Sequence, residues 1–145
     1  RNPIVYKEDY DFEIGKAITL KEGSDIAIIA TGTMVYESLN AAKILEEKGI
    51  SVKVVDMHTI KPIDTNIIKE CNDTKLIVTV EEHSVIGGLG SAVSEVLIQL
   101  QNHTTFLPIG IDDSFVNADE YETLLFNAGL KSEQIADKIL TTYKG

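Results

Sequence analysis

Basic residues are scarce in this sequence. Lys and Arg number 13 against 23 Asp and Glu, so the formal net charge at pH 7 is −10. Binding to a nucleic-acid backbone or to an anionic lipid surface requires a concentrated basic face. No apolar run approaches the roughly 20 residues that span a bilayer. We therefore expect neither nucleic acid nor a membrane among the partners.

Cysteine is also scarce. Cys71 is the single cysteine, so no disulfide forms within the chain, which is typical of a reducing compartment. No basic start followed by an apolar core indicates a signal peptide. We therefore expect a cytoplasmic protein. The sequence also lacks a Met at position 1, and we interpret it as part of a longer protein.

What the sequence does contain is a regular alternation of short apolar runs and amphipathic segments. Residues 25–30 form a nearly continuous apolar run, which is typical of a strand covered on both faces. Strands followed by helices in this way predict a mainly parallel sheet in a three-layer α/β/α sandwich. We predict strands at 17–20, 25–30, 50–57, 75–80 and 105–111, and helices around 34–48, 65–72, 92–100, 121–128 and 132–142.

The glycine-rich segment after the fourth predicted strand admits several interpretations. Gly88 to Val93 fits the start of a dinucleotide-binding G-x-G-x-x-G fingerprint, and the acidic pair Asp112-Asp113 lies about 20 residues further on. However, Val93 stands where the third glycine belongs, and residues 81–86 separate the strand from the glycines. The neighbouring carboxylates would also repel a pyrophosphate. We therefore do not favour a dinucleotide site.

The sequence Glu81-Glu82-His83 in the same segment admits two roles. His83 between carboxylates is a candidate proton shuttle near neutral pH. Alternatively, Glu81 or Glu82 accepts hydrogen bonds from amides at the start of the next helix, where the helix dipole favours an anion. We favour the structural role. The glycines then supply a turn with positive φ and a close approach of helix to sheet.

Other candidates for chemistry are weak. Ser91 lacks the G-x-S-x-G elbow, and Cys71 has no activating neighbour in the sequence. His58, His83 and His103 show no metal-ligand spacing, and we interpret His58 and His103 as surface or loop residues. We therefore predict no catalytic, cofactor-binding or metal-binding residue.

Several short motifs occur in one order along the chain: EGSD at 22–25, ATGT at 30–33, KPID at 61–64, and EEH at 81–83 followed by GGLG at 87–90. In this order the sequence resembles the C-terminal domain of the transketolase family from about residue 12 to residue 135. We accordingly divide the chain into a lead-in from an upstream domain at 1–15 and a transketolase C-terminal-like domain at 16–145. The likeness fails at 116–119, where Val-Asn-Ala-Asp replaces a Phe-Gly-x-Ser-Gly-like turn.

The resemblance implies a mixed five-stranded sheet of order 1-3-2-4-5 with the first strand antiparallel. In that order the connections leave the second strand in opposite directions, which opens a crevice at its carboxyl end. If the domain has a site of its own, we expect it there. The candidate residues are Thr31, Gly32, Thr33, Glu81, Glu82, His83, Gly87, Gly88 and Gly90.

The resemblance also implies a function for the whole protein. Transketolase-like enzymes use thiamine diphosphate and a divalent cation such as Mg²⁺ to move two-carbon ketol units between sugar phosphates. Their cofactor lies between upstream pyrimidine- and diphosphate-binding domains, across a homodimer interface. We therefore expect this domain to be structural, to hold the dimer together, and to be non-catalytic alone.

Two alternatives remain at this stage. Within the superfamily, the domain is also compatible with 1-deoxyxylulose-5-phosphate synthase or with the β subunit of a 2-oxo acid dehydrogenase E1. In a different class, it is a stand-alone anion- or nucleotide-binding regulatory module that uses the same crevice.

Overall fold

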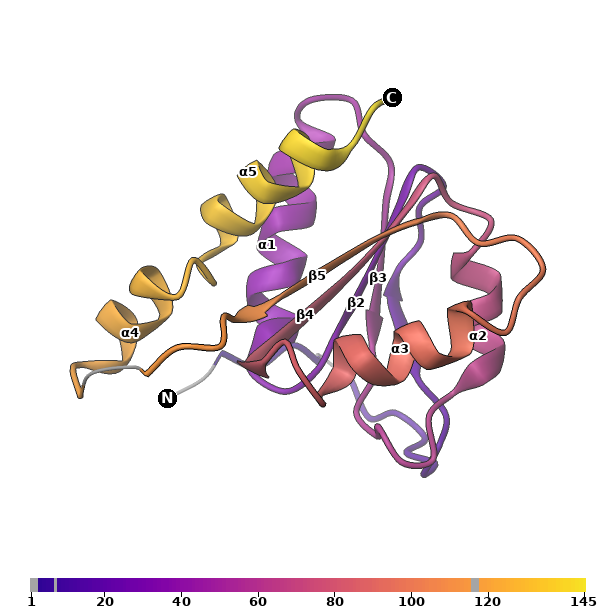
Figure 1. Cartoon of the computed structure of the whole chain (residues 1–145), viewed down its shortest axis with the longest axis horizontal. Coiled ribbons are helices and arrows are strands. Elements are labelled where there is room, and N and C mark those ends of the chain that lie inside the picture. Colours follow the sequence, from indigo (N-terminus) through magenta and orange to yellow (C-terminus); the bar gives the residue numbers. More distant parts are fainter. Residues whose placement is uncertain (1–2, 7, 116–117) are drawn as a thin grey trace.

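The computed structural model describes residues 3–6, 8–115 and 118–145 (Figure 1). Strands and helices alternate along this part of the chain, as the sequence predicts. The strands are β1 (Ile18–Lys21), β2 (Ile26–Ala30), β3 (Val52–Asp56), β4 (Leu76–Ser84) and β5 (Thr105–Ile111). The helices are α1 (Met34–Glu46), α2 (Thr65–Cys71), α3 (Leu89–Leu97), α4 (Tyr121–Asn127) and α5 (Ser132–Thr142).

The strands form one sheet of order β1-β3-β2-β4-β5. β1 runs antiparallel to β3, and the remaining neighbours are parallel. Ile26 at the start of β2 pairs with Val52 of β3 on one side and with Leu76 of β4 on the other. The predicted sheet order and the antiparallel first strand are therefore confirmed.

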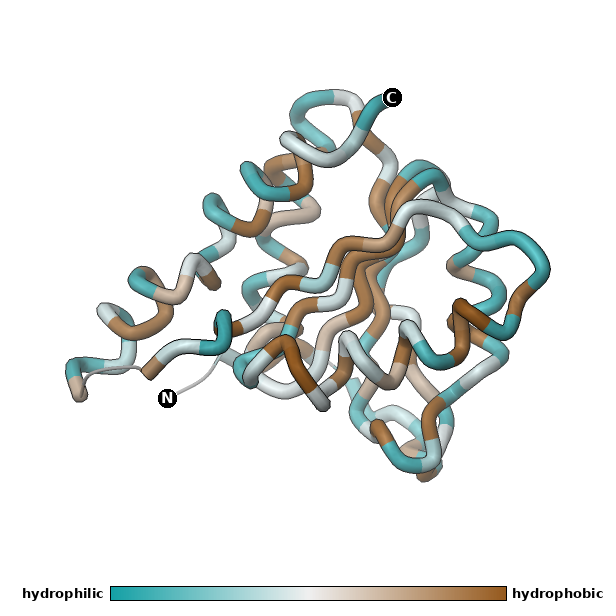
Figure 2. Tube along the Cα trace, viewed as in Figure 1, coloured by the Kyte–Doolittle hydropathy of each residue, from teal (hydrophilic) through white to brown (hydrophobic). Residues whose placement is uncertain are grey.

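The central position of β2 in the sheet explains why its sequence is apolar throughout. Successive strand side chains point to opposite faces of the sheet. Ile26 and Ile28 join the core that includes residues of α1 and α5, whereas Ala27 and Ile29 join the core that includes residues of α2 and α3. Helices thus cover both faces (Figure 1), and Figure 2 shows the hydrophobic residues concentrated along the central strands.

Local sequence signals set the boundaries of several elements. Asp64 caps α2, because its Oδ1 accepts from the backbone amides of Asn66 at 3.1 Å and Ile67 at 3.2 Å. Its Oδ2 accepts from the amide of Ala17 at 2.9 Å, which ties the start of β1 to this helix. Gly49 follows α1 with φ +80°, the left-handed conformation expected after a helix C-terminus.

Strand β4 is longer than its sequence predicts. We expected it to end at Val80 and to be followed by a loop, but it continues to Ser84 and includes the Glu-Glu-His sequence. Val80 pairs with Ile109 and Ser84 pairs with Ile111, so four steps along β4 match two along β5. This irregularity lets β4 stay paired with β5 beyond Val80.

None of the helices in the described ranges is long and apolar enough to cross a bilayer. The lead-in is described at residues 3–6 and 8–15, and the replaced family turn lies partly outside the described residues, at 116 and 117.

Candidate functional site

A depression lies at the carboxyl end of β2, where the connections to α1 and the end of β4 diverge. Its cavity volume is about 390 Å³. Eight of the nine candidate residues line it, and Ile60, which the sequence did not single out, lines it as well. Gly90 does not line it, because it lies buried in the first turn of α3. The lining residues are Thr31, Gly32, Thr33, Ile60, Glu81, Glu82, His83, Gly87 and Gly88.

The buried carboxylate of Glu81 binds the amino end of α3. Its side chain is only 2% exposed. Its Oε2 accepts from the amide of Leu89 at 2.7 Å and its Oε1 from the amide of Gly90 at 2.8 Å. These amides carry the positive end of the helix dipole. The favoured structural role of the Glu-Glu-His segment is therefore correct for Glu81.

The glycines around this contact are needed for different structural reasons. Gly87 has φ +83°, which favours glycine, whereas Gly88 has φ −101°. A Cβ on Gly88 would lie 1.9 Å from Glu81 Oε2, so this position needs the close approach and not the left-handed conformation. A Cβ on Gly90 would lie 3.1 Å from Thr79 Oγ1 on the sheet.

The occupied amides decide against an anion site at this helix. A phosphate or diphosphate bound here would have to displace a buried carboxylate and then lie beside it. The dinucleotide interpretation and the anion-binding module therefore lose the Leu89 and Gly90 amides as donors. In the described residues, no group of three or more His, Cys, Asp or Glu is placed to hold a metal ion.

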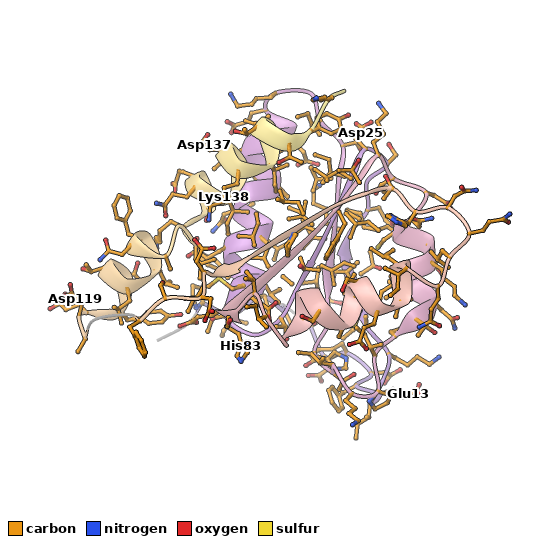
Figure 3. All side chains as sticks on the ribbon, in the orientation of Figure 1. Glu13, Asp25, His83, Asp119, Asp137 and Lys138 are labelled. Atoms are coloured by element: carbon orange, nitrogen blue, oxygen red, sulfur yellow. The ribbon has the colours of Figure 1, made fainter. Side chains whose placement is uncertain are left out.

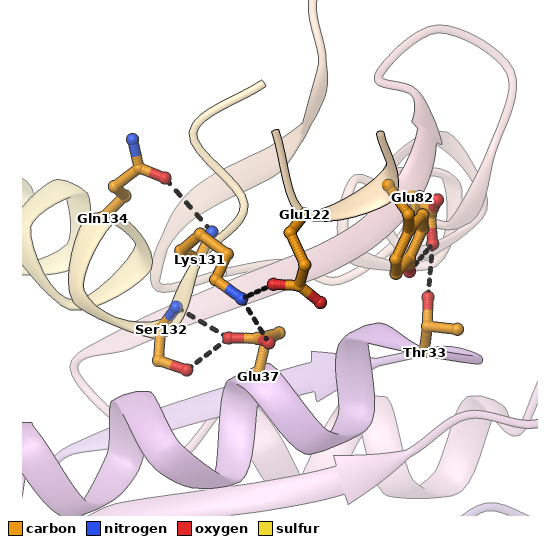
Figure 4. Close-up of polar contacts among 8 residues, drawn as sticks. Thr33, Glu37, Glu82, Glu122, Lys131, Ser132 and Gln134 are labelled. Atoms are coloured by element: carbon orange, nitrogen blue, oxygen red, sulfur yellow. Dashed lines mark hydrogen bonds and ion pairs between the residues drawn. The ribbon is translucent and has the colours of Figure 1, made fainter. Parts of the chain in front are cut away.

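Glu82 links three elements at the rim of the depression (Figure 4). Its Oε2 accepts from the hydroxyl of Thr33, which precedes α1, and from the hydroxyl of Tyr121 at 2.8 Å, which begins α4. Partial burial of the phenol and the neighbouring Glu82 carboxylate raise the pKa of Tyr121. The role of Tyr121 could not be predicted, because 39 residues separate it from Glu82.

His83 is not arranged as a proton shuttle with a carboxylate. Its Nδ1 lies 2.8 Å from the carbonyl oxygen of Ser84 and 3.9 Å from Glu81 Oε2, and the side chain is largely exposed. His103 is exposed in a loop, as expected. His58 lies in the loop after β3, but its ring packs against Phe12 at a centroid distance of 4.5 Å and both ring nitrogens are buried. His58 is thus a loop residue, as expected, although its ring nitrogens are buried.

A second carboxylate anchors the end of the chain (Figure 4). Glu37 on α1 is buried and accepts from the amide of Ser132 at 2.8 Å and from the Ser132 hydroxyl. Lys131 Nζ lies 3.5 Å from Glu37 and 2.6 Å from Glu122. α5 is therefore held to α1 by a contact that spans 95 residues of sequence.

Cys71 is chemically quiet. The thiol is fully buried at the end of α2, and burial raises its pKa to about 12. Thiolate is the reactive form of cysteine. The geometry thus gives Cys71 a packing role.

Comparison with known proteins identifies the fold and the relatives. The sequence-family model of the transketolase C-terminal domain matches residues 15–135 of this chain. A protein of Methanocaldococcus jannaschii named as a transketolase C-terminal section is 48% identical over 143 residues, which are 97% of this chain and 45% of that protein. The 1-deoxy-D-xylulose-5-phosphate synthase of Caldanaerobacter subterraneus is 41% identical over 134 residues, covering 92% of this chain and 22% of that enzyme.

A solved structure agrees with these matches. A split gene transketolase, solved as an inactive β4 tetramer, superimposes with a TM-score of 0.89 and 41% identity, over 96% of this chain and 46% of that one. The chain thus spans less than half the length of the relatives that it matches. Sequence and fold together place the chain in one family: it belongs to the transketolase C-terminal domain family.

Proposed function

We propose that this chain is the C-terminal domain of a thiamine diphosphate-dependent transketolase, which moves two-carbon ketol units between sugar phosphates. The family membership and the relatives named as transketolases support this function. In this proposal residues 16–145 form the domain, and residues 1–15 lead in from upstream polypeptide. That polypeptide belongs to the same chain or to a separate subunit, and the whole enzyme is a cytoplasmic homodimer of such units.

The observation that carries the assignment of roles is the carboxylate of Glu81 on the α3 amides. The start of α3 borders the crevice, and its Leu89 and Gly90 amides are already bonded to Glu81, so these two donors do not serve a diphosphate. We infer that the pyrimidine- and diphosphate-binding parts outside these residues hold the cofactor and its Mg²⁺. The domain itself then acts as a structural support and is non-catalytic alone.

A second candidate is 1-deoxy-D-xylulose-5-phosphate synthase. The 41% identity with the enzyme of that name is only slightly below the identity with the transketolase section. The crevice residues do not separate the two functions, because none of them contacts a sugar phosphate in either proposal. Substrate choice therefore depends on the upstream polypeptide.

The test is an assay of the whole protein with thiamine diphosphate, Mg²⁺, a ketose phosphate donor and an aldose phosphate acceptor. Transfer of the two-carbon unit supports a transketolase. In a parallel assay pyruvate replaces the ketose phosphate donor, and loss of CO₂ with formation of 1-deoxy-D-xylulose 5-phosphate supports the second candidate. The 145 residues alone are assayed beside it, and turnover by them would contradict the structural role. Sedimentation of the whole protein tests the dimer.

A further inference from the structure

The exposed apolar side chains are concentrated at one end of the sheet. Eleven large apolar side chains are exposed among the residues that the structure describes. Ten of them lie in the lead-in, in the first turn of α1, or in segments that follow the carboxyl ends of β3, β4 and β5; Ile98, after α3, lies at the opposite end. Soluble proteins rarely expose a group of such residues unless the group binds another molecule. Those outside the lead-in are Tyr36, Ile60, Ile86, Phe115, Tyr121 and Phe126.

The same end of the sheet is acidic. From residue 76 to residue 130 the sequence holds eight Asp and Glu and no Lys or Arg. Six of the eight keep their side chains at the surface, one near the end of β4 and five after β5: Glu82, Asp112, Asp113, Asp119, Glu120 and Glu122. Of these, Glu122 is paired with Lys131. Figure 3 shows His83 and Asp119 toward this end and Asp25, at the start of β2, toward the other. A surface that binds here needs Lys and Arg around an apolar centre.

The lead-in arrives at this same end. The Tyr6 hydroxyl donates to Oδ2 of Asp56, the last residue of β3, and the amide of Gly15 donates to the Thr59 hydroxyl at 2.9 Å. Phe12 packs on His58 in the loop after β3. The described part of the lead-in therefore lies at the carboxyl end of β3, at the same end of the sheet as the apolar and acidic residues. The relatives have more than half of their length outside the matched part.

We propose that these residues form a docking face for the upstream, catalytic half of the enzyme. The face, called here the carboxyl-edge face, comprises Ile60, Ile86, Phe115, Tyr121 and Phe126 with the six acidic residues and the depression between β2 and β4. Its occupant is an apolar surface rimmed by Lys and Arg. This inference rests on the proposed function, because that function supplies the upstream half.

The first test is zero-length carbodiimide cross-linking of the whole native protein, followed by mass spectrometry. Asp112 and Asp113 have no lysine near them in sequence, so their cross-links report spatial neighbours. We expect cross-links to lysines of the upstream half, and weaker cross-linking at high salt. A mixture of ¹⁵N-labelled and unlabelled protein distinguishes cross-links within one copy from cross-links between two copies. The proposal would be overturned if Asp112 and Asp113 were cross-linked only within this domain, or only to the same domain of a second copy.

The second test compares Phe126→Asp and Ile86→Asp with Ile98→Asp as the matched control. Each change places a charge at an exposed apolar position, so the fold is expected to persist in all three. Association of the domain with the upstream half, in cis or as a subunit, is expected to weaken about tenfold or more in the first two variants. Equal weakening in Ile98→Asp, or none in Phe126→Asp and Ile86→Asp, would overturn the proposal.

The outcomes separate this inference from the proposed function. A whole protein that shows the expected cross-links but transfers no ketol unit supports the docking face and contradicts the transketolase assignment. An active whole protein without these cross-links contradicts the docking face alone.

Discussion

Replacing Glu81 by Gln is expected to destabilise the domain strongly, although the side chain keeps its size. The amide retains an oxygen for one of the two α3 amides, at Leu89 or Gly90, but turns its NH₂ group toward the other. Hydrogen bonds to charged groups contribute about 1.5–3 kcal/mol each. The charge–dipole interaction adds about 0.3–1 kcal/mol.

The expected loss is therefore about 3 kcal/mol of the free energy of unfolding, out of about 5–15 kcal/mol for a domain. Urea denaturation followed by circular dichroism measures it, provided that the m-value stays unchanged. Amide exchange at the first turn of α3 is expected to accelerate in the same variant.

Glu82→Gln is the matched control one residue away. Its partners are hydroxyl groups of Thr33 and Tyr121 at the exposed rim, and a glutamine oxygen still accepts from both. We expect a loss below about 1 kcal/mol for this variant. A loss below about 1 kcal/mol for Glu81→Gln, or equal losses for the two variants, would show that the Glu81 carboxylate does not stabilise the start of α3.

Further predictions concern four other positions. Gly87→Ala is expected to cost about 1 kcal/mol because of its φ of +83°, whereas Gly88→Ala is expected to cost about 3 kcal/mol because its Cβ displaces Glu81; equal urea midpoints would contradict this difference. Glu37→Gln is expected to accelerate hydrogen exchange throughout α5, with exposed Glu133→Gln as the unchanged control, since a buried acceptor for Ser132 is weakened. The pKa of Cys71 rises from 9.0 to about 12 on folding, so the unfolded state binds fewer protons and stability falls as pH rises from 9 toward 12. Between pH 8 and pH 10 the protein is expected to lose about 1.4 kcal/mol more than Cys71→Ala, and identical pH profiles would rule this out.

Much of the fold was predictable because it depends on local patterns. The apolar run at 25–30 identifies the central strand, and Asp64 and Gly49 mark a helix start and a helix end by rules that act within a few residues. The sheet order came from the family resemblance and not from these patterns.

The candidate site was predictable in part. Topology placed Thr31–Thr33 and Glu81–His83 at one end of the sheet, and they line one depression. The length of β4 was not predictable, because its last residues are polar and pair only through a bulge opposite β5. The contacts of Tyr121 and Glu37 bridge 39 and 95 residues, and no local pattern encodes such a separation.

Pro108 in the edge strand β5 governs how this sheet meets other molecules. The carbonyl oxygen of Ile111 accepts from the amide of Val85, which follows β4, so the backbone of Ile111 faces β4. The backbone groups of successive strand residues point alternately to the two neighbouring edges. Pro108, three residues before Ile111, therefore faces the open edge of the sheet. Proline has no amide hydrogen to donate there. A neighbouring strand thus finds the row of donors interrupted at its centre, which disfavours lateral growth of the sheet into ribbons or fibres.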